Sequence, residues 1–247
     1  MKRIVVATTI REGSSDDLIE STRARVFLDT ARAFQAAQYT VVAVHIECTN
    51  SYLTEVSRFG VKLIPQRGTT MGAVRRQALC AAASEADVEF VFWTEPEKPH
   101  CAVVLQSITE LGIPANQTLF FNRNSMSSYP KEQVCYYEFI RAVATSQLGF
   151  DFDYGFGPML IHKSGLRQFV EYEGDYGDKW DAVLVPRLRL ISSHLPFSVL
   201  PISFQNDKRL LQCEQGNARI IQKRLQQLNN VVPSMLSELT RLKRCVS

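Results

Sequence analysis

One stretch of the chain, residues 61–100, constrains the fold more than any other. It reads as a short strand at 61–65, a loop containing Gly68, a helix at 71–86 and a second strand at 88–93. The helix is predicted by a composition rich in Ala, Leu, Arg and Gln with apolar residues at helical spacing. The second strand is predicted by an apolar, β-branched and aromatic run that ends at two prolines, which a helix could not pass. Strand, helix and strand in this order predict a parallel α/β unit.

Two carboxylates, Glu95 and Glu97, follow the second strand directly, with Pro96 between them. In open α/β sheets, ligands bind outside the carboxyl ends of the strands. Hard oxygen donors one residue apart suit a divalent cation that also holds a diphosphate. The alternative is that both glutamates are solvated charges at a strand end.

The rest of the 247-residue chain continues this alternation, and no linker interrupts it. We therefore expect a single α/β domain with a mostly parallel central sheet flanked by helices. Further strands are expected at 3–9, 39–46, 118–121, 159–162 and 198–204, and further helices at 16–38, 51–59, 101–111, 131–148 and 164–170.

The C-terminal part differs from the rest. From Gly216 onwards, Ile, Leu and Val recur mostly at helical spacing among Lys, Arg and Gln. This pattern predicts an amphipathic helix, or two helices broken near Pro233. We expect residues 1–210 to form the α/β domain and residues 211–247 to form a helical extension packed on it. A homodimer through this helix and a basic helix on a membrane surface are the alternatives.

Composition argues against several classes of protein. The apolar content of 45% and the charged content of 21% are ordinary for a globular protein. The net charge of +3 is too small and too evenly spread to favour nucleic-acid binding. No segment reaches the roughly 18 apolar residues of a membrane span, and six cysteines without metal-type spacing read as core thiols of a reducing compartment. We therefore expect a cytoplasmic protein with no transmembrane segment and no nucleic-acid partner.

The stretch at 61–100 resembles the glycosyltransferase A fold of the nucleotide-diphospho-sugar transferases. In that family a central strand ends in an Asp-x-Asp motif that binds a metal ion and the sugar nucleotide, preceded by a Gly-containing loop and a helix that bears Arg. Here Glu95-Pro96-Glu97 stands where Asp-x-Asp would be. The resemblance implies Mn or Mg at Glu95 and Glu97. Each carboxylate is one methylene longer than Asp, which changes the metal geometry or removes metal binding.

The resemblance also implies contacts to the nucleotide. The residues just after the first strand line the pocket for the base and ribose, an acidic residue after the second strand contacts the uridine or ribose, and arginines of the loop and helix neutralise the phosphates. The corresponding candidates are Thr8, Thr9 and Arg11, then Glu47, then Arg67, Arg75 and Arg76.

An acidic loop later in the chain supplies candidates for a catalytic acid. Members of the resembled family carry an acidic pair below the acceptor pocket, and in inverting enzymes one of these acids is the general base. Asp178 and Asp181 occupy this place in the order of elements. A carboxylate suits the task if partial burial raises its pKa towards neutrality. The alternative role for either aspartate is to cap the following helix.

A second carboxylate pair, Asp151 and Asp153, lies in a glycine-containing loop after a predicted helix. It matches Asp-x-Asp better by letter than the glutamates do, but no apolar strand leads into it. We therefore expect this loop to lie on the acceptor side, with the pair as a secondary metal candidate.

Three functions remain in competition. The first is a metal-assisted glycosyltransferase that uses a nucleotide-diphosphate sugar and an unknown acceptor. The second is a catalytically silent nucleotide-sugar-binding or interaction module of the same fold, favoured by the Asp-to-Glu changes. Nucleotidyl transfer is the third, and the missing Gly-rich first loop argues against it. A dinucleotide-binding domain is disfavoured because the GxGxxG fingerprint is absent.

Overall fold

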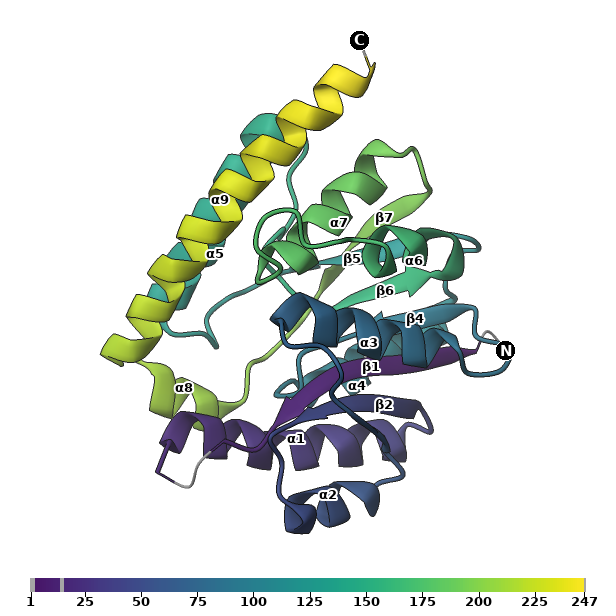
Figure 1. Ribbon diagram of the computed structural model, residues 1–247, viewed down its shortest axis with the longest axis vertical. Helices are drawn as coiled ribbons and strands as arrows, with labels where there is room; N and C mark the ends of the chain where they lie inside the picture. The colour runs from purple at the N-terminus through teal and green to yellow at the C-terminus, as the bar shows by residue number, and fades with distance from the viewer. Residues whose placement is uncertain (1–2, 14–15, 247) are drawn as a thin grey trace.

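The computed structural model describes residues 3–13 and 16–246, and within these ranges the chain forms a seven-stranded sheet with helices on both faces (Figure 1). The strands are β1 (Ile4–Arg11), β2 (Thr40–Ile46), β3 (Lys62–Pro65), β4 (Phe90–Trp93), β5 (Thr118–Arg123), β6 (Met159–His162) and β7 (Phe197–Ile202). Their order is β3-β2-β1-β4-β6-β5-β7. Only β6 runs antiparallel to its neighbours among the described strands. The predicted mostly parallel α/β sheet is confirmed.

The centre of the sheet is formed by β1 and β4, and the first four side chains of β1 and all four of β4 are apolar and buried. Strands covered on both faces need continuous apolar runs, and IVVA in β1 and FVFW in β4 supply them. The two strands pair in parallel, with Ala7 opposite Trp93. Their carboxyl ends therefore lie side by side, and the segment that follows β4 begins next to the last residues of β1.

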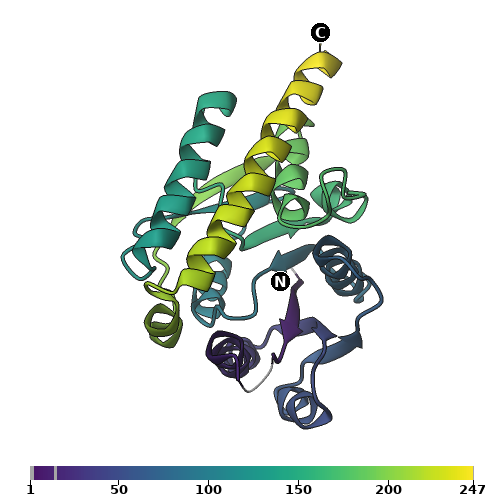
Figure 2. The ribbon, with the colours of Figure 1, turned by 60° about the vertical axis from the view of Figure 1, so that its left-hand side comes forward.

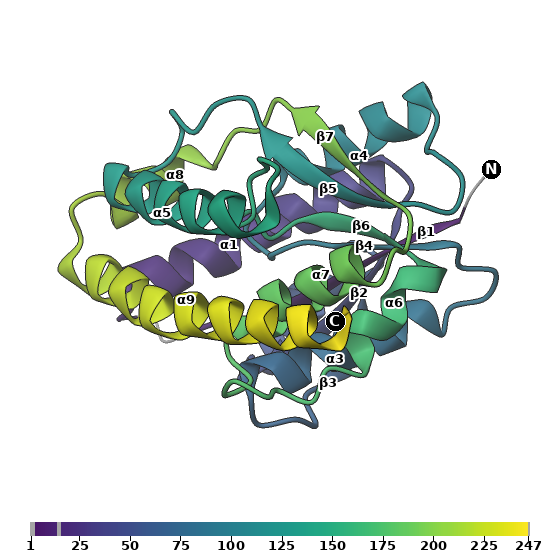
Figure 3. The same ribbon diagram turned by 90° about the horizontal axis from the view of Figure 1, so that it is seen from above.

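Helices form the outer layers. They are α1 (Leu18–Ala36), α2 (Asn50–Ser57), α3 (Met71–Ala83), α4 (His100–Leu111), α5 (Lys131–Leu148), α6 (Lys163–Val170), α7 (Asp181–Ser192), α8 (Lys208–Glu214) and α9 (Ala218–Val246). Helices α1 and α4 pack on one face of the sheet, and α3, α6 and α7 pack on the other (Figure 2). Figure 3 shows α5 and α9 side by side, at the end of the sheet opposite the start of β1.

The C-terminal region is a short helix followed by a long one. Sequence did not predict α8, which Asp207 caps by accepting a hydrogen bond from the Arg209 amide at 2.8 Å. The expected domain boundary after residue 210 falls inside this helix, and the division into two parts stays a prediction. Of the two alternatives for the last segment, one continuous helix is correct, because α9 passes through Pro233 without a break. Pro233 and Asn229 are both exposed, so water can satisfy the carbonyl that proline leaves without a donor.

Helix α9 is anchored to the domain by Glu238, whose side chain is fully buried. Its carboxylate accepts hydrogen bonds from Arg189 Nε at 2.9 Å, from the Tyr176 hydroxyl at 2.9 Å and from Arg241 Nε at 3.1 Å. Burial alone would raise the pKa of Glu238, but the bonds from Arg241, Arg189 and Tyr176 outweigh burial and lower this pKa to about 2. The charged form of this carboxylate therefore stabilises the packing of α9 on α7.

The exposure of side chains bears on the predicted core thiols and on the predicted dimer. Cys101 is buried in α4, but Cys80 and Cys135 are exposed on the outer faces of α3 and α5, so the expectation that the cysteines are core thiols is wrong for these two. Among the described residues, none of the helices combines the length and the apolar character that a membrane span requires. Leu225 and Leu236 are exposed apolar side chains of α9, and the homodimer through this helix stays a prediction.

We expect Glu238→Gln to lower the free energy of unfolding by about 2 kcal/mol at pH 7, because the neutral amide loses charged hydrogen bonds to Arg189 and Arg241. The pKa in the folded protein lies below the ordinary value of 4.5, so the stabilisation is present above pH 4.5 and is lost as the pH falls towards 2. Urea unfolding of both proteins should therefore show a difference in stability that is full at neutral pH and shrinks below pH 4.5. Glu138→Gln, at an exposed glutamate of α5, is the control. Equal effects of the two substitutions would contradict the anchoring role.

Candidate functional site

Two adjoining cavities open where β1 and β4 end. The helix-side cavity, of about 190 Å³, reaches α5 and α9. The strand-side cavity, of about 230 Å³, reaches the ends of β1 and β2. Both are lined by Arg23, Met71, Arg75, Glu95 and Glu97, so they are two compartments of one site. This is the edge at which open α/β sheets bind ligands, as the sequence predicted for the segment after β4.

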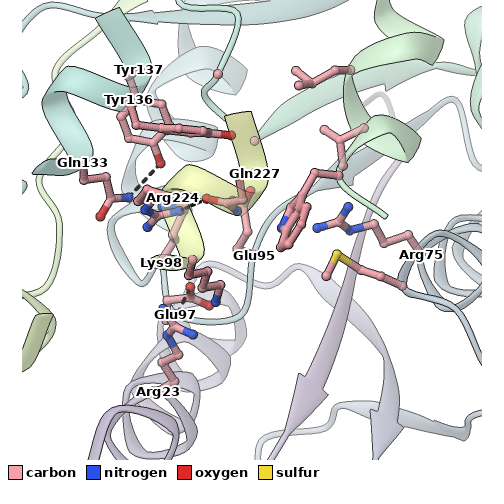
Figure 4. Close-up of a pocket in the computed structure, with 17 residues that line it drawn as sticks. Arg23, Arg75, Glu95, Glu97, Lys98, Gln133, Tyr136, Tyr137, Arg224 and Gln227 are labelled. Atoms are coloured by element: carbon pink, nitrogen blue, oxygen red, sulfur yellow. Dashed lines mark hydrogen bonds and ion pairs between the residues drawn. The ribbon is translucent and has the colours of Figure 1, made fainter. Parts of the chain in front are cut away.

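The helix-side cavity is lined by residues that lie far apart in the sequence (Figure 4). They include Arg23 of α1, Arg75 of α3, Glu95, Glu97 and Lys98 after β4, Gln133, Tyr136 and Tyr137 of α5, and Lys223, Arg224 and Gln227 of α9. Five of the lining side chains are Lys or Arg and two are Glu. The formal excess of three positive charges makes this cavity suited to an anionic ligand.

Three of the cations pack against aromatic rings. Lys98 is buried, with its Nζ 5.3–5.6 Å from the ring centres of Tyr129, Phe156 and Phe204. Arg224 lies 5.4 Å from the ring centre of Tyr136, and Arg75 lies 6.0 Å from that of Trp93. Ring faces attract cations and limit their rotation. These charges are therefore held in place before any ligand arrives.

Burial and the neighbouring cations affect the protonation of Lys223. Burial, together with the charges of Arg23 and Arg224, lowers the pKa of Lys223 to about 8. A bound anion would offset these effects and favour the protonated amine.

Glu97 lies among cations. Arg23 Nε is 3.9 Å from its Oε1, and the same guanidinium binds Glu20, at 2.8 Å, and Glu214. Burial raises the pKa of Glu97, but the charges of Arg23 and Lys98 outweigh burial and hold this pKa below its ordinary value. Glu97 is therefore an ionised carboxylate that already has an arginine counterion.

Glu95 packs against a glycine of the loop that precedes β6. A Cβ atom on Gly157 would overlap the Glu95 carboxylate, so only glycine fits this position without a shift. The loop is held by Arg187, which is buried and donates hydrogen bonds to the carbonyl oxygens of Tyr154, at 3.0 Å, and Phe156, at 2.6 Å. Arg187 thereby fixes the surface on which Glu95 lies.

Several buried polar atoms of the lining residues have no hydrogen-bond partner within the described part of the chain. These atoms are Arg23 Nε, Trp93 Nε1, Glu95 Oε2, Gln133 Oε1 and Arg224 Nε. Buried polar atoms are normally paired, and exceptions call for an explanation such as an ion, a water molecule or a ligand. Their concentration around both cavities indicates a site for a polar ligand.

The predicted nucleotide contacts divide into two groups. Thr9 and Arg11 line the strand-side cavity, and Arg75 lines both cavities. Arg11 also forms an ion pair with Glu47, and both side chains are more than half exposed, at 56% and 68%. Glu47 lines neither cavity.

Three further candidates lie outside both cavities. Thr8 is buried, and its hydroxyl is unpaired within the described residues. Arg67 is exposed, and Arg76 forms an ion pair with Asp178. The predicted roles of these three residues in binding a nucleotide stay predictions.

Asp178 joins the loop before α7 to the start of α3. Its carboxylate accepts hydrogen bonds from the Thr70 hydroxyl, from the Ala73 amide at 3.1 Å and from Arg76 Nη2 at 3.0 Å. Burial raises the pKa of Asp178, but the bonds from Arg76 and Thr70 outweigh burial and lower it. A Cβ atom on Gly72 would overlap this carboxylate, so glycine allows α3 to begin here.

Asp181 is fully buried at the start of α7. It accepts hydrogen bonds from the Tyr172 hydroxyl, from the Asp178 amide at 3.2 Å and from the Lys179 amide at 2.8 Å. Asp178 and Asp181 line neither cavity, although Trp180 between them lines the helix-side one. Neither carboxylate caps α7 in the contacts shown: Asp178 binds the first turn of α3, and Asp181 accepts from amides that precede α7, whose N-cap residue Trp180 has no side-chain cap bond. A role as general base stays a prediction.

The second carboxylate pair is divided between two arginines. Asp153 is buried in an ion pair with Arg123, and Asp151 forms an ion pair with Arg141 at the surface. Neither aspartate lines the helix-side or the strand-side cavity. The glycines beside the pair do contribute to the helix-side cavity, because Gly155 and Gly157 line it.

A divalent ion at this site would need carboxylate oxygens as ligands. Within residues 3–13 and 16–246, no group of three or more His, Cys, Asp or Glu is close enough to hold a metal ion. Glu97 already pairs with Arg23, and a second positive ion beside this pair would face the lysines and arginines of the cavity. This donor set does not fit a divalent-ion site, and Mn or Mg at Glu95 and Glu97 stays a prediction.

No protein-family model and no curated protein matches the chain. Solved structures do match. Glucosyl-3-phosphoglycerate synthase from Mycobacterium tuberculosis, in complex with Mn²⁺, UDP and glucosyl-3-phosphoglycerate, gives a TM-score of 0.65 at 9% identity, over 97% of this chain and 80% of that one. The chain has a glycosyltransferase A-like fold. A putative nucleotide-diphospho-sugar transferase from Desulfovibrio desulfuricans gives a TM-score of 0.51 at 9% identity, over 94% of this chain and 98% of that one.

The fold predicted from the resemblance is thus confirmed, and the low identity agrees with a divergent sequence. Within this glycosyltransferase A-like fold, sequence reasoning missed several lining residues. Arg23 lies near the start of α1 and reads as a surface charge. The residues of α5 and α9 lie far along the chain from the carboxylates. One available signal was Gln133, Tyr136 and Tyr137, a polar and aromatic stripe at helical spacing on α5.

Because an alanine side chain at position 157 would displace the flexible end of the Glu95 side chain, we expect Gly157→Ala to lower the free energy of unfolding by about 1 kcal/mol. Glu95→Ala removes the obstacle, so the double variant should be more stable than Gly157→Ala alone. Urea unfolding of the four proteins forms a double-mutant cycle. Additive effects of the two substitutions would show that Glu95 does not pack on this glycine.

Proposed function

We propose that the protein transfers a sugar from a nucleoside diphosphate sugar to an acceptor molecule. The observation that carries the proposal is the excess of positive charge in a cavity at the carboxyl ends of β1 and β4. A glycosyltransferase A-like fold with this charge suits a donor whose phosphates are anionic. Support also comes from the solved structures with this fold, one of which is described in complex with UDP.

The two compartments would divide the donor between them. The strand-side cavity, with Thr9, Arg11, Tyr52 and Trp93, offers aromatic and polar groups for the nucleoside. Arg75 lines both cavities, so it would lie beside the diphosphate that joins nucleoside and sugar. The planar guanidinium can bind phosphate oxygens through two parallel hydrogen bonds.

The sugar and the acceptor would lie next to the diphosphate, on the side of the helix-side cavity that the glycine loop lines. Gly155 and Gly157 line it without side chains, which leaves room for a sugar ring against the loop. Trp180 also lines this cavity and offers an apolar face. Glu95 would accept a hydrogen bond from a sugar or acceptor hydroxyl, since its Oε2 has no partner among the described residues.

The aspartates predicted as catalytic acids would act here by positioning. Asp178 joins the loop to α3, the helix that carries Arg75, and Asp181 holds the loop that contains Trp180 by accepting a hydrogen bond from the Lys179 amide. To serve as a general base, Asp178 would have to leave Arg76, and Asp181 would have to leave Tyr172. Metal-assisted transfer would likewise require Glu97 to leave Arg23.

A second candidate is a catalytically silent module that binds a nucleotide sugar without turning it over. The engagement of Glu97, Asp178 and Asp181 with other side chains favours it. Release of nucleoside diphosphate from any sugar nucleotide, measured with an acceptor library, would rule this candidate out. A cytoplasmic location, an absence of nucleic-acid binding and a homodimer through α9 remain predictions in either case.

We expect Arg75→Ala to weaken the binding of a sugar nucleotide at least tenfold, or about 1.4 kcal/mol, because the diphosphate loses a guanidinium partner. Thermal-shift titrations with UDP, GDP and their sugar conjugates measure this, since a ligand of the folded state raises the melting temperature. Arg167→Ala, at an exposed arginine of α6 that lines neither cavity, should bind as the unmodified protein does. The proposal is wrong if no sugar nucleotide raises the melting temperature, or if Arg75→Ala binds with unchanged affinity.

A further inference from the structure

We propose that the helix-side cavity binds the donor diphosphate through Arg75, Lys98, Lys223 and Arg224, without a divalent metal ion. The inference rests on the proposed function, because it takes the anionic ligand to be a nucleoside diphosphate. It replaces the Mn or Mg ion that the family resemblance implies at Glu95 and Glu97 with cationic side chains. It also makes the C-terminal helix α9 part of the binding site.

The side chains that line the helix-side cavity keep an excess of positive charge after their ion pairs are counted. Arg23 is engaged by Glu20, Glu214 and Glu97, so Glu97 and this arginine offset each other. Among the lining residues, Glu95 then faces four remaining cations, which leaves the excess of three positive charges intact. The two phosphate groups of a sugar nucleotide are both ionised at neutral pH. Fixed side chains can therefore neutralise them with no further cation.

The four cations reach the cavity from separate elements of the fold. Arg75 lies on α3, Lys98 follows β4, and Lys223 and Arg224 lie on α9. Figure 4 shows Arg75 and Arg224 reaching the cavity from different sides, with Glu95 between them. Charges that surround a ligand from separate rigid elements are preorganised, as those of a bound metal ion would be.

Arg224 offers a hydrogen-bond donor that no other described residue uses. Arg224 Nε is buried and has no partner within the described residues, while its Nη1 donates to Gln227 at 2.7 Å. The bond to Gln227 fixes the plane of the guanidinium, and the stacking on Tyr136 limits its tilt. A phosphate oxygen would satisfy this free donor through a charge-assisted hydrogen bond.

The two glutamates of the cavity are poorly suited to hold a divalent metal ion. Glu97 has the Arg23 guanidinium 3.9 Å away, which leaves Glu95 as the other carboxylate of the cavity lining that could bind an ion. Mg²⁺ is bound through one or two carboxylates together with waters and substrate phosphates, and among the described residues no third His, Cys, Asp or Glu joins Glu95 and Glu97 to hold an ion. Like charges of the cavity would also oppose entry of the ion.

Isothermal titration calorimetry with UDP, GDP and inorganic pyrophosphate, in EDTA and again in Mn²⁺, tests the proposal. On the unmodified protein, we expect a Kd in EDTA within about twofold of the Kd in Mn²⁺. Lys223→Met combined with Arg224→Met should weaken binding at least tenfold. Arg219→Met, at an exposed arginine of the same helix, should change the Kd less than twofold. Glu95→Gln combined with Glu97→Gln should bind in EDTA at least as tightly as the unmodified protein, whereas a metal site would be lost.

The outcomes separate this inference from the proposed function. Nucleotide binding that appears only with Mn²⁺ would overturn the inference and leave the proposed function standing. Pyrophosphate binding in EDTA without binding of any nucleotide would support the cationic site and overturn the proposed function. No binding of any probe would overturn both. The comparison of EDTA with Mn²⁺ uses the unmodified protein, so it decides the question even if a variant fails to fold.

Discussion

The parallel pairing of β1 with β4 is the constraint on which the rest of the site depends. It brings the ends of two buried strands together, so that Thr9 and Glu95, far apart in the sequence, line the same cavity. Helices α5 and α9 lie beyond this edge of the sheet and contribute further residues to the lining of the helix-side cavity.

Charge, more than shape, distinguishes this cavity. Buried cations are costly unless carboxylates, aromatic rings or ligands compensate them. Here Arg23 is compensated by glutamates, and Lys98 by aromatic rings, while Lys223 and Arg224 lie beside each other with fewer anions nearby. Such an arrangement favours a molecule that brings its own negative charge. The fold provides the position for that molecule, and the lysines and arginines provide the attraction.

The sheet could be predicted from the sequence because periodicity is local. A buried run such as FVFW and a capped helix such as α3 each carry their own signal. The location of the site at the end of β4 followed from the order of the elements. The partners of each charge could not be predicted, because the contacts of Arg23 with Glu214 and of Asp178 with Arg76 span long stretches of chain. Helix α8 was missed because its few residues carry too little periodicity.

The continuity of α9 through Pro233 has a mechanical consequence. Glu238, which anchors the helix, and Lys223, which faces the cavity, lie 15 positions apart on one rod, or about 22 Å. The contacts of Glu238 with Arg189 and Tyr176 therefore hold in place the same helix that carries Lys223 and Arg224 to the cavity.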